Sequence, residues 1–439
     1  MTLYRKSELL GSLLAILIIF SSIGTITVIQ ASNFEAKTIT NNYSIILMIG
    51  DGMGHNHVTL GQYVEVGKDN NLTMESLPKQ YSVYTNNVND ILTDSAAAAT
   101  AIATGEKTSN GNIAVSITGE ILKTILETAI ELGKSTGVVS TAFVQHATPA
   151  SFITHVNSRN NYDEITRQIV ENANVDILLG GGSSYITEEQ IETMITKGYT
   201  FVTNKTALES QTSGRIFGLF SGGHMPYEED RNLTLIPSLA EMTSKSLEIL
   251  AQDTDGFFLM VEGGRIDHAA HDNDKVGVAL ETIAFDKAIN EALIYTKEHP
   301  NTILLVTADH ETGGLEIVSD NLNEILPVFG NTEEQNRTIR ISRVNSITVD
   351  WKTGGHTTRH VPLFAYGKTL EGIEANYLID NTEINHLMND YFLGNDLTLN
   401  KFAEPISMNQ LWLLGATLAI SFITINIIIR RKNKQKRKQ

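Results

Sequence analysis

Residues 43–54 read Tyr-Ser-Ile-Ile-Leu-Met-Ile-Gly-Asp-Gly-Met-Gly, a short apolar run that ends in a glycine-rich turn. An uninterrupted apolar run of this length is typical of a strand that is buried on both faces of a sheet. The turn carries one carboxylate, Asp51, and its glycines let the backbone approach an ion or a ligand closely. Because Asp-Gly is also an ordinary turn signal, this stretch alone predicts the strand and leaves the purpose of Asp51 open.

The same pattern of a buried strand followed by a polar side chain recurs along the chain. Residues 136–141 lead to His146, residues 256–261 to Glu262, and residues 302–307 to Asp309 and His310. Apolar residues at three- and four-residue spacing predict helices over 122–132, 239–252 and 276–295, and residues 176–179 form a further strand candidate. Strands that alternate with helices predict an α/β fold with a mainly parallel central sheet and helices on both faces.

This fold has a consequence for the polar side chains that follow the strands. In open α/β sheets, ligands collect beyond the C-terminal ends of the strands, so we expect the four polar clusters to meet at one edge. Residues 320–350 differ from the rest, because they are polar and rich in asparagine. We interpret them as an irregular excursion with weak strands before a strand over 348–351.

The two ends of the chain predict a membrane topology. Residues 1–31 combine two basic residues with a long apolar run and a small residue, Ala31, which is the layout of a signal peptide or of an uncleaved signal anchor. Residues 411–429 carry no charge and are long enough to cross a hydrocarbon core of about 30 Å as a helix. A basic tail at 430–439 follows and should stay in the cytoplasm. We therefore predict an exported catalytic body at 32–408 and one transmembrane helix at 409–429.

Net charge and cysteine content exclude one class of partner and one type of metal ligand. The ends carry nine of the 33 basic residues and one of the 50 acidic ones, so the body between them has a net charge of about −25. Such a surface repels nucleic acid, which we exclude as a partner. The chain has no cysteine, so any zinc would be held by histidine and carboxylate side chains.

Two segments offer such metal ligands close together. In residues 262–271, Asp267 and His271 are four apart and would share one face of a helix, where both can bind one divalent cation. Glu262 lies at the end of the preceding strand and can reach a second ion. The alternative for Asp267 is a structural role, because an aspartate at a helix start also suits the helix dipole. Asp309 and His310 end another strand, and His356 follows a later one.

A hydroxyl with a possible catalytic role lies at the start of a predicted helix. Residues 93–105 read Thr-Asp-Ser-Ala-Ala-Ala-Ala-Thr-Ala-Ile-Ala-Thr-Gly, which favours a helix that begins near Ser95. At that position the backbone N–H groups and the helix dipole favour an anion. Asp94 or Ser95 could instead be an ordinary helix cap, and the residues alone leave both interpretations open.

Taken together, six ordered segments resemble the alkaline phosphatases, over a stretch from about Ser44 to Gly367. The segments are residues 49–54, 93–98, 146–150, 261–268, 307–314 and 354–357. The resemblance implies two Zn²⁺ ions and one Mg²⁺ ion. One zinc site would contain Asp267, His271 and His356, the other Asp51, Asp309 and His310, and the magnesium site Asp51, Thr148 and Glu262.

The resemblance also implies catalytic roles. Ser95 would be the nucleophile, Arg159 the clamp on the phosphate, and Asp94 the residue that orients the arginine. His146 and His268 would lie near the third ion, which zinc or cobalt could replace because an imidazole is a softer group than a carboxylate. We assign His155 and His224 to structure or surface.

The predicted activity is the hydrolysis of small phosphate monoesters through a phosphoserine, with phosphate released outside the cytoplasm. One alternative is a phosphodiesterase of the same superfamily, but Ser95, Thr148 and Glu262 argue against it. A second is a metal-binding surface protein without catalysis. The resemblance further implies a possible homodimer.

Overall fold

The computed structural model describes residues 42–400 except 173, 321, 323–326 and 329. Its main sheet consists of β1 (Ser44–Ile49), β2 (Lys79–Tyr84), β3 (Ser135–Phe143), β4 (Ile177–Gly181), β5 (Tyr199–Val202), β6 (Arg215–Leu219), β7 (Phe257–Glu262), β8 (Thr302–Thr307), β13 (Val361–Tyr366) and β14 (Leu378–Asp380). Across the sheet the order is β14-β2-β13-β8-β1-β7-β3-β4-β6-β5. Only β13 runs antiparallel to its neighbours among these strands, so the predicted mainly parallel sheet is confirmed.

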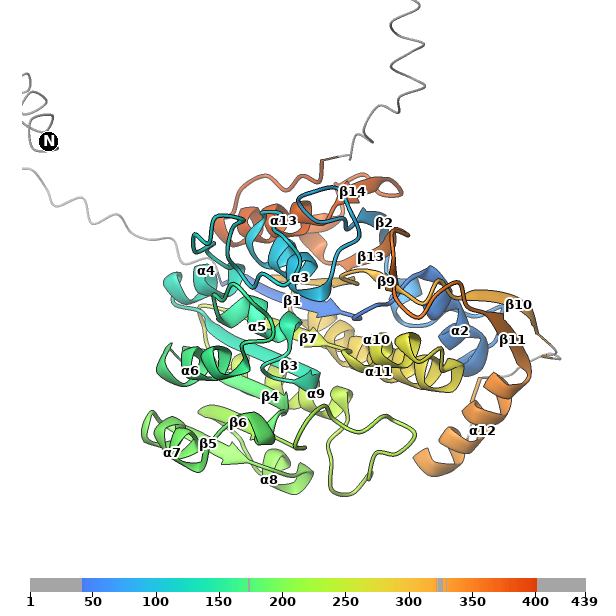
Figure 1. Cartoon of the computed structure of the whole chain (residues 1–439), viewed down its shortest axis with the longest axis horizontal. Helices are drawn as coiled ribbons and strands as arrows, with labels where there is room; N and C mark the ends of the chain where they lie inside the picture. Colours follow the sequence, from blue (N-terminus) through green and yellow to red (C-terminus); the bar gives the residue numbers. More distant parts are fainter. Residues whose placement is uncertain (1–41, 173, 321, 323–326, 329, 401–439) are drawn as a thin grey trace, which may run out of the picture. The chain divides into compact units, whose positions relative to one another are not determined.

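Helices cover both faces of this sheet (Figure 1). They are α2 (His55–Glu65), α3 (Ser95–Thr104), α4 (Ile125–Glu131), α5 (Ala147–Ile153), α6 (Tyr162–Asn172), α7 (Glu188–Thr196), α8 (Lys205–Glu209), α9 (Leu239–Leu250), α10 (Arg265–His271), α11 (Lys275–Glu298), α12 (Glu333–Asn345) and α13 (Thr382–Leu393), with single 3₁₀ turns at Met74–Ser76, Ser183–Tyr185 and Lys368–Leu370. Helices α4 and α5 pack on one face of the central strands, and α9 and α11 pack on the other. The predicted helices at 122–132, 239–252 and 276–295 correspond to α4, α9 and α11.

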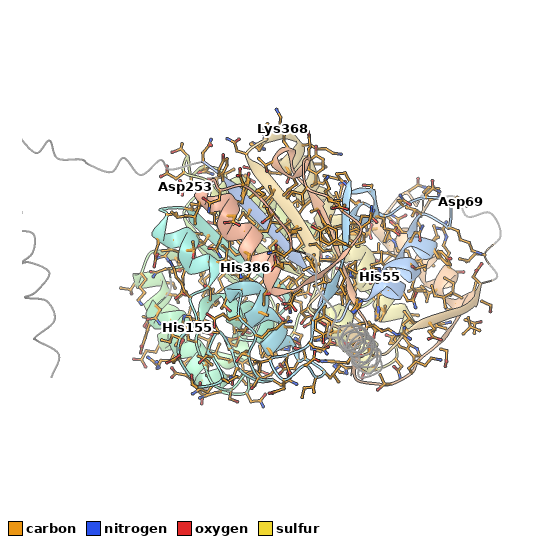
Figure 2. The ribbon with its side chains drawn as sticks, turned by 90° about the horizontal axis from the view of Figure 1, so that it is seen from above. His55, Asp69, His155, Asp253, Lys368 and His386 are labelled. Carbon is orange, nitrogen blue, oxygen red and sulfur yellow. The ribbon has the colours of Figure 1, made fainter. Side chains whose placement is uncertain are left out.

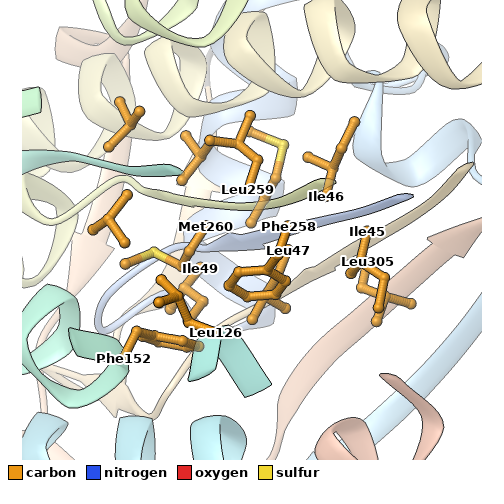
Figure 3. Packing of buried hydrophobic residues seen from close by; sticks show 14 of the residues in the cluster. Ile45, Ile46, Leu47, Ile49, Leu126, Phe152, Phe258, Leu259, Met260 and Leu305 are labelled. Atoms are coloured by element: carbon orange, nitrogen blue, oxygen red, sulfur yellow. The ribbon is translucent and has the colours of Figure 1, made fainter. Parts of the chain in front are cut away.

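The central strands are apolar through their middle because both of their faces are buried. All six residues of β1 are buried, and β1 lies between β7 and β8. Side chains alternate between the two faces along a strand. Figure 3 shows Leu47 and Phe258 on the face of Leu126 and Phe152, whereas Leu259 points to the opposite face. The rings of Phe152 and Phe258 stack with centroids 6.0 Å apart.

The register of the parallel strands brings their polar ends level with one another. Ile49 at the end of β1 pairs with Glu262 on β7 and with Thr307 on β8. Asp51 therefore leaves the sheet beside Glu262, and Asp309 leaves it two residues beyond Thr307. Residues more than two hundred positions apart in sequence thus meet at one edge, as the fold class predicts.

Two small sheets lie outside the main one. The first pairs β9 (Glu311–Thr312) with β12 (His356–Thr357), and the second pairs β10 (Glu316–Asp320) with β11 (Ile347–Asp350). The excursion predicted over residues 320–350 was wrong in one respect, because it contains helix α12. This polar helix is capped by Thr332, and its buried Arg340 binds Glu65. Because these contacts are polar, they leave no apolar periodicity in the sequence that would predict the helix.

The predicted end segments lie outside the described residues. These are the signal segment at 1–31, the transmembrane helix at 409–429 and the basic tail at 430–439, and the limits of the catalytic body at 32 and 408 stay predictions with them. Within the part of the chain that the structure describes, no helix combines the length and the apolar character needed to cross a membrane.

Candidate active site

The first group of candidate metal ligands joins helix α10 to strand β12. Asp267 and His271 lie four apart on α10, and Nε2 of His271 is 3.4 Å from Oδ2 of Asp267. Nε2 of His356 lies 3.1 Å from Nε2 of His271 and 3.8 Å from Oδ1 of Asp267. The Nδ1 atoms face the backbone carbonyls of Gly354 (2.7 Å) and Thr93 (2.8 Å), to which they can only donate. Nε2 is therefore the nitrogen that each ring can offer to a cation, and the two Nε2 atoms lie close enough to each other and to the Asp267 carboxylate to bind the same ion.

The second group is fully buried and consists of Asp51, Asp309 and His310. Nε2 of His310 is 3.5 Å from Oδ1 of Asp51 and 3.4 Å from Oδ2 of Asp309. Both carboxylate oxygens of Asp51 and Oδ2 of Asp309 are buried without a hydrogen-bond partner. Burial, together with the charge of Asp267, raises the pKa of Asp309 to about 7, and burial raises the pKa of Asp51 well above its usual range. Buried carboxylates without partners are costly unless a cation compensates them, so this group fits a metal ion.

A third group consists of Asp51, His146 and Glu262, all of them buried. Oε1 of Glu262 and Oγ1 of Thr148 have no hydrogen-bond partner, and the other Glu262 oxygen accepts a hydrogen bond from Ser140. Burial and, to a smaller extent, the charge of Asp309 raise the pKa of Glu262 to about 7. The hydrogen bond from Ser140 opposes this rise. Asp51 is shared with the second group, so the two groups are adjacent. The resemblance implied Asp51, Thr148 and Glu262 as ligands of the third ion with His146 nearby, and a ring nitrogen of His146 does lie within 4.8 Å of the carboxylate oxygens of Asp51 and Glu262.

Ser95 lies beside the second group at the first residue of α3. Its Oγ is 3.2 Å from Nε2 of His310, and the residue is 1% exposed. Asp94 caps the helix, because Oδ1 accepts a hydrogen bond from the backbone N–H of Ala97 at 2.9 Å. The two interpretations of residues 94–95 are therefore compatible, since Asp94 is the cap and Ser95 faces the candidate metal ligands.

Arg159 is held by Asp94 and His146. Its Nη1 donates to Oδ2 of Asp94 at 3.1 Å, and its Nη2 donates to Nε2 of His146 at 3.1 Å. The backbone N–H of Gly111 donates to the same Asp94 oxygen at 3.0 Å. The guanidinium is thus bound to the residue that precedes Ser95, and its fork can bind two oxygens of a phosphate.

Three histidine rings lie close together at this edge, and the sequence predicted only two of them there. His268 was predicted near the third ion, and its ring centroid lies 5.6 Å from that of His146. His224, which we assigned to structure or surface, lies 4.1 Å from His268 and 5.4 Å from His146. No local sequence signal marked His224, because a loop after β6 brings it there. His155, labelled in Figure 2, binds Glu127 and the carbonyl of Ala114 instead, as a structural residue does.

Thr312 is a second residue that the sequence did not single out. Its Oγ1 lies 2.5 Å from Oδ1 of Asp267 and 3.2 Å from Nδ1 of His310. It therefore touches one member of each of the first two groups. All the predicted ligand and catalytic residues lie at this one edge of the sheet, and their individual roles stay predictions.

The C-terminal edge of this mainly parallel sheet brings together carboxylates, imidazoles, an arginine and a serine at the start of a helix. This combination is that of a metal-dependent hydrolase. The sequence model of the family described as alkaline phosphatase matches residues 42–341. The chain belongs to the alkaline phosphatase family and is one of its enzymes.

Relatives support this assignment over most of the chain. Alkaline phosphatase 3 of Bacillus subtilis strain 168 is 33% identical over 432 residues, which cover 84% of this chain and 93% of that protein. The crystal structure of a cold-active alkaline phosphatase from a Shewanella species is 32% identical, with a TM-score of 0.69 over 79% of this chain and 99% of its own.

A third similar structure contains a bound metal ion. It is a variant of the alkaline phosphatase from the Antarctic bacterium TAB5, in which one histidine is replaced by glutamate and Mg is bound in the M3 site. It is 28% identical, with a TM-score of 0.67 over 80% of this chain and 97% of its own. The family is metal dependent, which agrees with the three groups of ligands described above.

Proposed function

We propose that the protein hydrolyses phosphate monoesters through a phosphoserine at Ser95. The observation that carries this proposal is the 3.2 Å separation between Ser95 Oγ and Nε2 of His310, a residue of the buried metal-ligand group. A serine hydroxyl is a weak nucleophile until a base or a cation activates it. A buried site that combines such a group with Arg159 can both activate the serine and hold the phosphate.

In the first half-reaction, Ser95 Oγ attacks phosphorus as the bond from phosphorus to the leaving alkoxide breaks. The serine proton passes through solvent to the alkoxide, which departs as the alcohol, and the phosphoryl group stays on Ser95. In the second, water attacks the phosphoserine, inorganic phosphate leaves and the serine regains its proton. Arg159 holds two phosphate oxygens through both halves, and Asp94 keeps the guanidinium in position.

Two Zn²⁺ ions and one Mg²⁺ ion are the proposed cofactors. One Zn²⁺ would be held by Asp267, His271 and His356, and the other by Asp51, Asp309 and His310. These nitrogen and oxygen donors suit zinc in the absence of cysteine. When bound, the ions supply positive charge that favours the ionised serine and stabilises the departing oxygen.

Hydrogen bonding to Arg159 favours magnesium in the third group. A guanidinium has only donors, so Nε2 of His146 accepts from Arg159 and the imidazole proton lies on Nδ1. In this tautomer neither ring nitrogen of His146 offers a lone pair to an ion, although Nδ1 has no hydrogen-bond partner, and the oxygens of Asp51, Thr148 and Glu262 are then the ligands. Oxygen ligands suit Mg²⁺, whereas a histidine ligand would have favoured Zn²⁺ or Co²⁺.

The third metal can be tested with His146→Glu. A carboxylate there adds an oxygen ligand, and the TAB5 variant with glutamate in place of a histidine binds Mg in its M3 site. We expect the variant to hold Mg²⁺ at lower free Mg²⁺ than the unchanged protein, as measured by metal analysis after equilibrium dialysis. Equal Mg²⁺ retention in both proteins, with Zn²⁺ or Co²⁺ in the third site, would contradict the assignment.

The proposed reaction is tested by trapping the covalent intermediate. The protein is mixed with ³²P-labelled phosphate, quenched in acid and digested, and we expect the label on the peptide that contains Ser95. Ser95→Ala should lose both the label and the release of p-nitrophenol from p-nitrophenyl phosphate. Ser76→Ala, at an exposed serine, is the control and should keep both.

A diester substrate separates the proposal from the phosphodiesterase alternative. Bis-p-nitrophenyl phosphate should be a poorer substrate than the monoester by several orders of magnitude. Faster turnover of the diester, or full activity of Ser95→Ala, would overturn the phosphomonoesterase proposal.

We further propose that the catalytic body lies outside the cytoplasm and is tethered by the helix at 409–429. The support is the uncharged run followed by the basic tail at 430–439. Protease added to intact cells should release the body and leave a small C-terminal fragment. A body that stays intact until the cells are lysed would show the opposite orientation.

A homodimer is the proposed assembly. The loop before Asp94 exposes three apolar side chains, with 38% of Val88, 56% of Ile91 and 38% of Leu92 accessible. Apolar side chains gathered on one exposed loop suit a contact with a second copy of the chain. Light scattering should give twice the monomer mass, and Ile91→Asp should lower it. A monomer at micromolar concentration would contradict this assembly.

A further inference from the structure

Thr312 occupies the point where the two proposed zinc sites meet. The residue is fully buried on strand β9. Its Oγ1 lies 2.5 Å from Oδ1 of Asp267, a ligand of one site, and 3.2 Å from Nδ1 of His310, a ligand of the other. One hydroxyl group therefore bridges side chains that belong to two different metal sites.

The backbone of Thr312 adds two further links. Its N–H donates to the carbonyl of Gly52 at 3.1 Å, next to Asp51. In the pairing of β9 with β12, Thr312 lies opposite His356. The peptide unit and the hydroxyl together connect Thr312 to segments that supply ligands to both sites.

The proton count at the hydroxyl fixes the state of His310. A threonine hydroxyl has one proton, and the hydroxyl of Thr312 donates it to Oδ1 of Asp267. The hydroxyl must then accept a hydrogen bond from His310, so the imidazole proton lies on Nδ1. Nε2 of His310 keeps its lone pair, which faces Asp51, Asp309 and Ser95.

His310 differs in this respect from the two other histidine ligands. His271 and His356 each direct Nδ1 to a backbone carbonyl, that of Gly354 or that of Thr93, which no substitution removes. His310 directs Nδ1 to a side chain. Among the described residues, Thr312 is thus the one partner through which a single substitution can release a histidine ligand and a carboxylate ligand together.

We propose that Thr312 is a positioning residue that couples the two zinc sites. Its hydroxyl holds Asp267 in place for one ion and sets the tautomer of His310 for the other, so that occupancy of either site favours occupancy of its neighbour. This inference rests on the proposed two-zinc function and adds to it the residue that links the sites.

The test compares Thr312→Val, which keeps the shape and removes the hydroxyl, with Thr312→Ser, which restores the hydroxyl. The full-length chain is equilibrated with buffered free Zn²⁺ and its zinc content is measured. Loss of a group that orients metal ligands typically weakens metal binding by about 10- to 100-fold. We expect Thr312→Val to need that much more free Zn²⁺ at both sites and to fill them independently, whereas Thr312→Ser should bind as the unchanged protein does.

Thr296→Val is the matched control. Thr296 is equally buried, and its hydroxyl donates to the carbonyl of Ala292 on α11, far from the ligands in the chain. It should bind zinc like the unchanged protein. Wild-type zinc binding by Thr312→Val would overturn the inference, while failure of the unchanged protein to bind two zinc ions would instead refute the proposed cofactors.

A second measurement covers the case in which Thr312→Val does not fold. In the metal-free unchanged protein, ¹⁵N NMR of labelled histidine reports which ring nitrogen carries the proton, and His310→Asn identifies the signal. The inference requires the proton on Nδ1 of His310. A proton on Nε2 would overturn it without any variant at Thr312.

Discussion

The carboxylate of Asp94 holds the guanidinium of Arg159, with Oδ2 3.1 Å from Nη1, while its other oxygen caps helix α3 at Ala97. One side chain thus fixes both the start of the helix that carries Ser95 and the group that binds phosphate. Both side chains are about one fifth exposed, so solvent screens their attraction, and their value lies in orientation rather than in stability.

Substitution of Asp94 should separate these two roles. Asp94→Asn keeps an oxygen for the cap and loses the charge that orients Arg159, so we expect kcat/KM to fall by about 10- to 100-fold, as loss of a hydrogen bond to a charged group implies. Asp94→Ala should in addition lower the free energy of unfolding by about 1 kcal/mol. Steady-state kinetics and urea denaturation measure the two effects.

The control for the cap is Thr187→Ala. Thr187 caps α7 in the same way through Gln190, away from the active site. It should lose a similar amount of stability with no change in KM. A normal KM and normal inhibition by phosphate in Asp94→Asn would show that Arg159 does not depend on Asp94.

Removal of the metals should reverse the sign of the change that Asp51→Asn makes in the midpoint of thermal unfolding. With metals bound, the substitution removes a shared ligand and should lower the midpoint of thermal unfolding. Without metals, Asp51 is a buried carboxylate among Asp309, Asp267 and Glu262, and the repulsion between them destabilises the fold. After EDTA treatment at pH 8, Asp51→Asn should therefore unfold at a higher temperature than the unchanged protein, as measured by calorimetry.

Asp286→Asn is the comparison for this experiment. Asp286 is also buried, but it accepts hydrogen bonds from the backbone N–H groups of Thr73 and Met74 and belongs to none of the metal-ligand groups. Its substitution should destabilise the protein with and without metals. The same sign for Asp51→Asn in both conditions would mean that the buried carboxylates do not repel one another.

Gly52→Ala should disturb the site through a steric contact. Gly52 has φ +71°, and a Cβ there would lie 2.7 Å from Oδ1 of Asp267, a proposed zinc ligand. We expect a loss of more than about 1 kcal/mol of stability from the backbone conformation alone. In addition, displacement of Asp267 should weaken zinc binding by about tenfold or more. Denaturation and zinc titration measure these effects.

Gly133→Ala isolates the backbone contribution. Gly133 has φ +76° and nothing within 4 Å of an added Cβ. It should lose stability like Gly52→Ala and bind zinc normally. If both variants bind zinc equally well, the close approach of Gly52 to Asp267 has no role in the site.

Glu281 should make the stability of the protein fall as the pH rises. Burial, together with the charge of Glu228, raises the pKa of Glu281 to about 8, although its oxygen accepts a hydrogen bond from the Glu228 backbone N–H at 2.6 Å. Because the folded state binds this proton more tightly than the unfolded chain, the contribution is present below about pH 4.5 and is lost as the pH rises through 8. The shift corresponds to at most roughly 5 kcal/mol.

Glu281→Gln keeps the hydrogen-bond acceptor and removes the charge. We expect the variant to match the unchanged protein at pH 5 and to exceed it in the free energy of unfolding at pH 9, in urea titrations with saturating metals. Glu298→Gln, an exposed glutamate at the end of the same helix, should show no such pH-dependent difference. A constant difference between Glu281→Gln and the unchanged protein from pH 5 to pH 9 would contradict the assignment.

Much of the fold could be predicted because its signals are local. The apolar run at 44–49 identifies a buried strand, and the spacing of Asp267 and His271 places both on one face of α10. The cap signal at Asp94 or Ser95 predicted a helix that begins near Ser95, where α3 does begin. Helix α12 was missed because Arg340 and Glu65, from distant parts of the chain, hold it in place and no apolar pattern marks it.

By itself the sequence determined which side chains end the strands and which chemistry they offer, because the strand, turn and cap signals depend on neighbours a few residues away. Its resemblance to a family grouped those side chains into sites. Only the tertiary structure decided that His224 lies against His268 and that the hydroxyl of Thr312 joins Asp267 to His310. These contacts depend on strand order and register, which bring together residues that no local pattern connects.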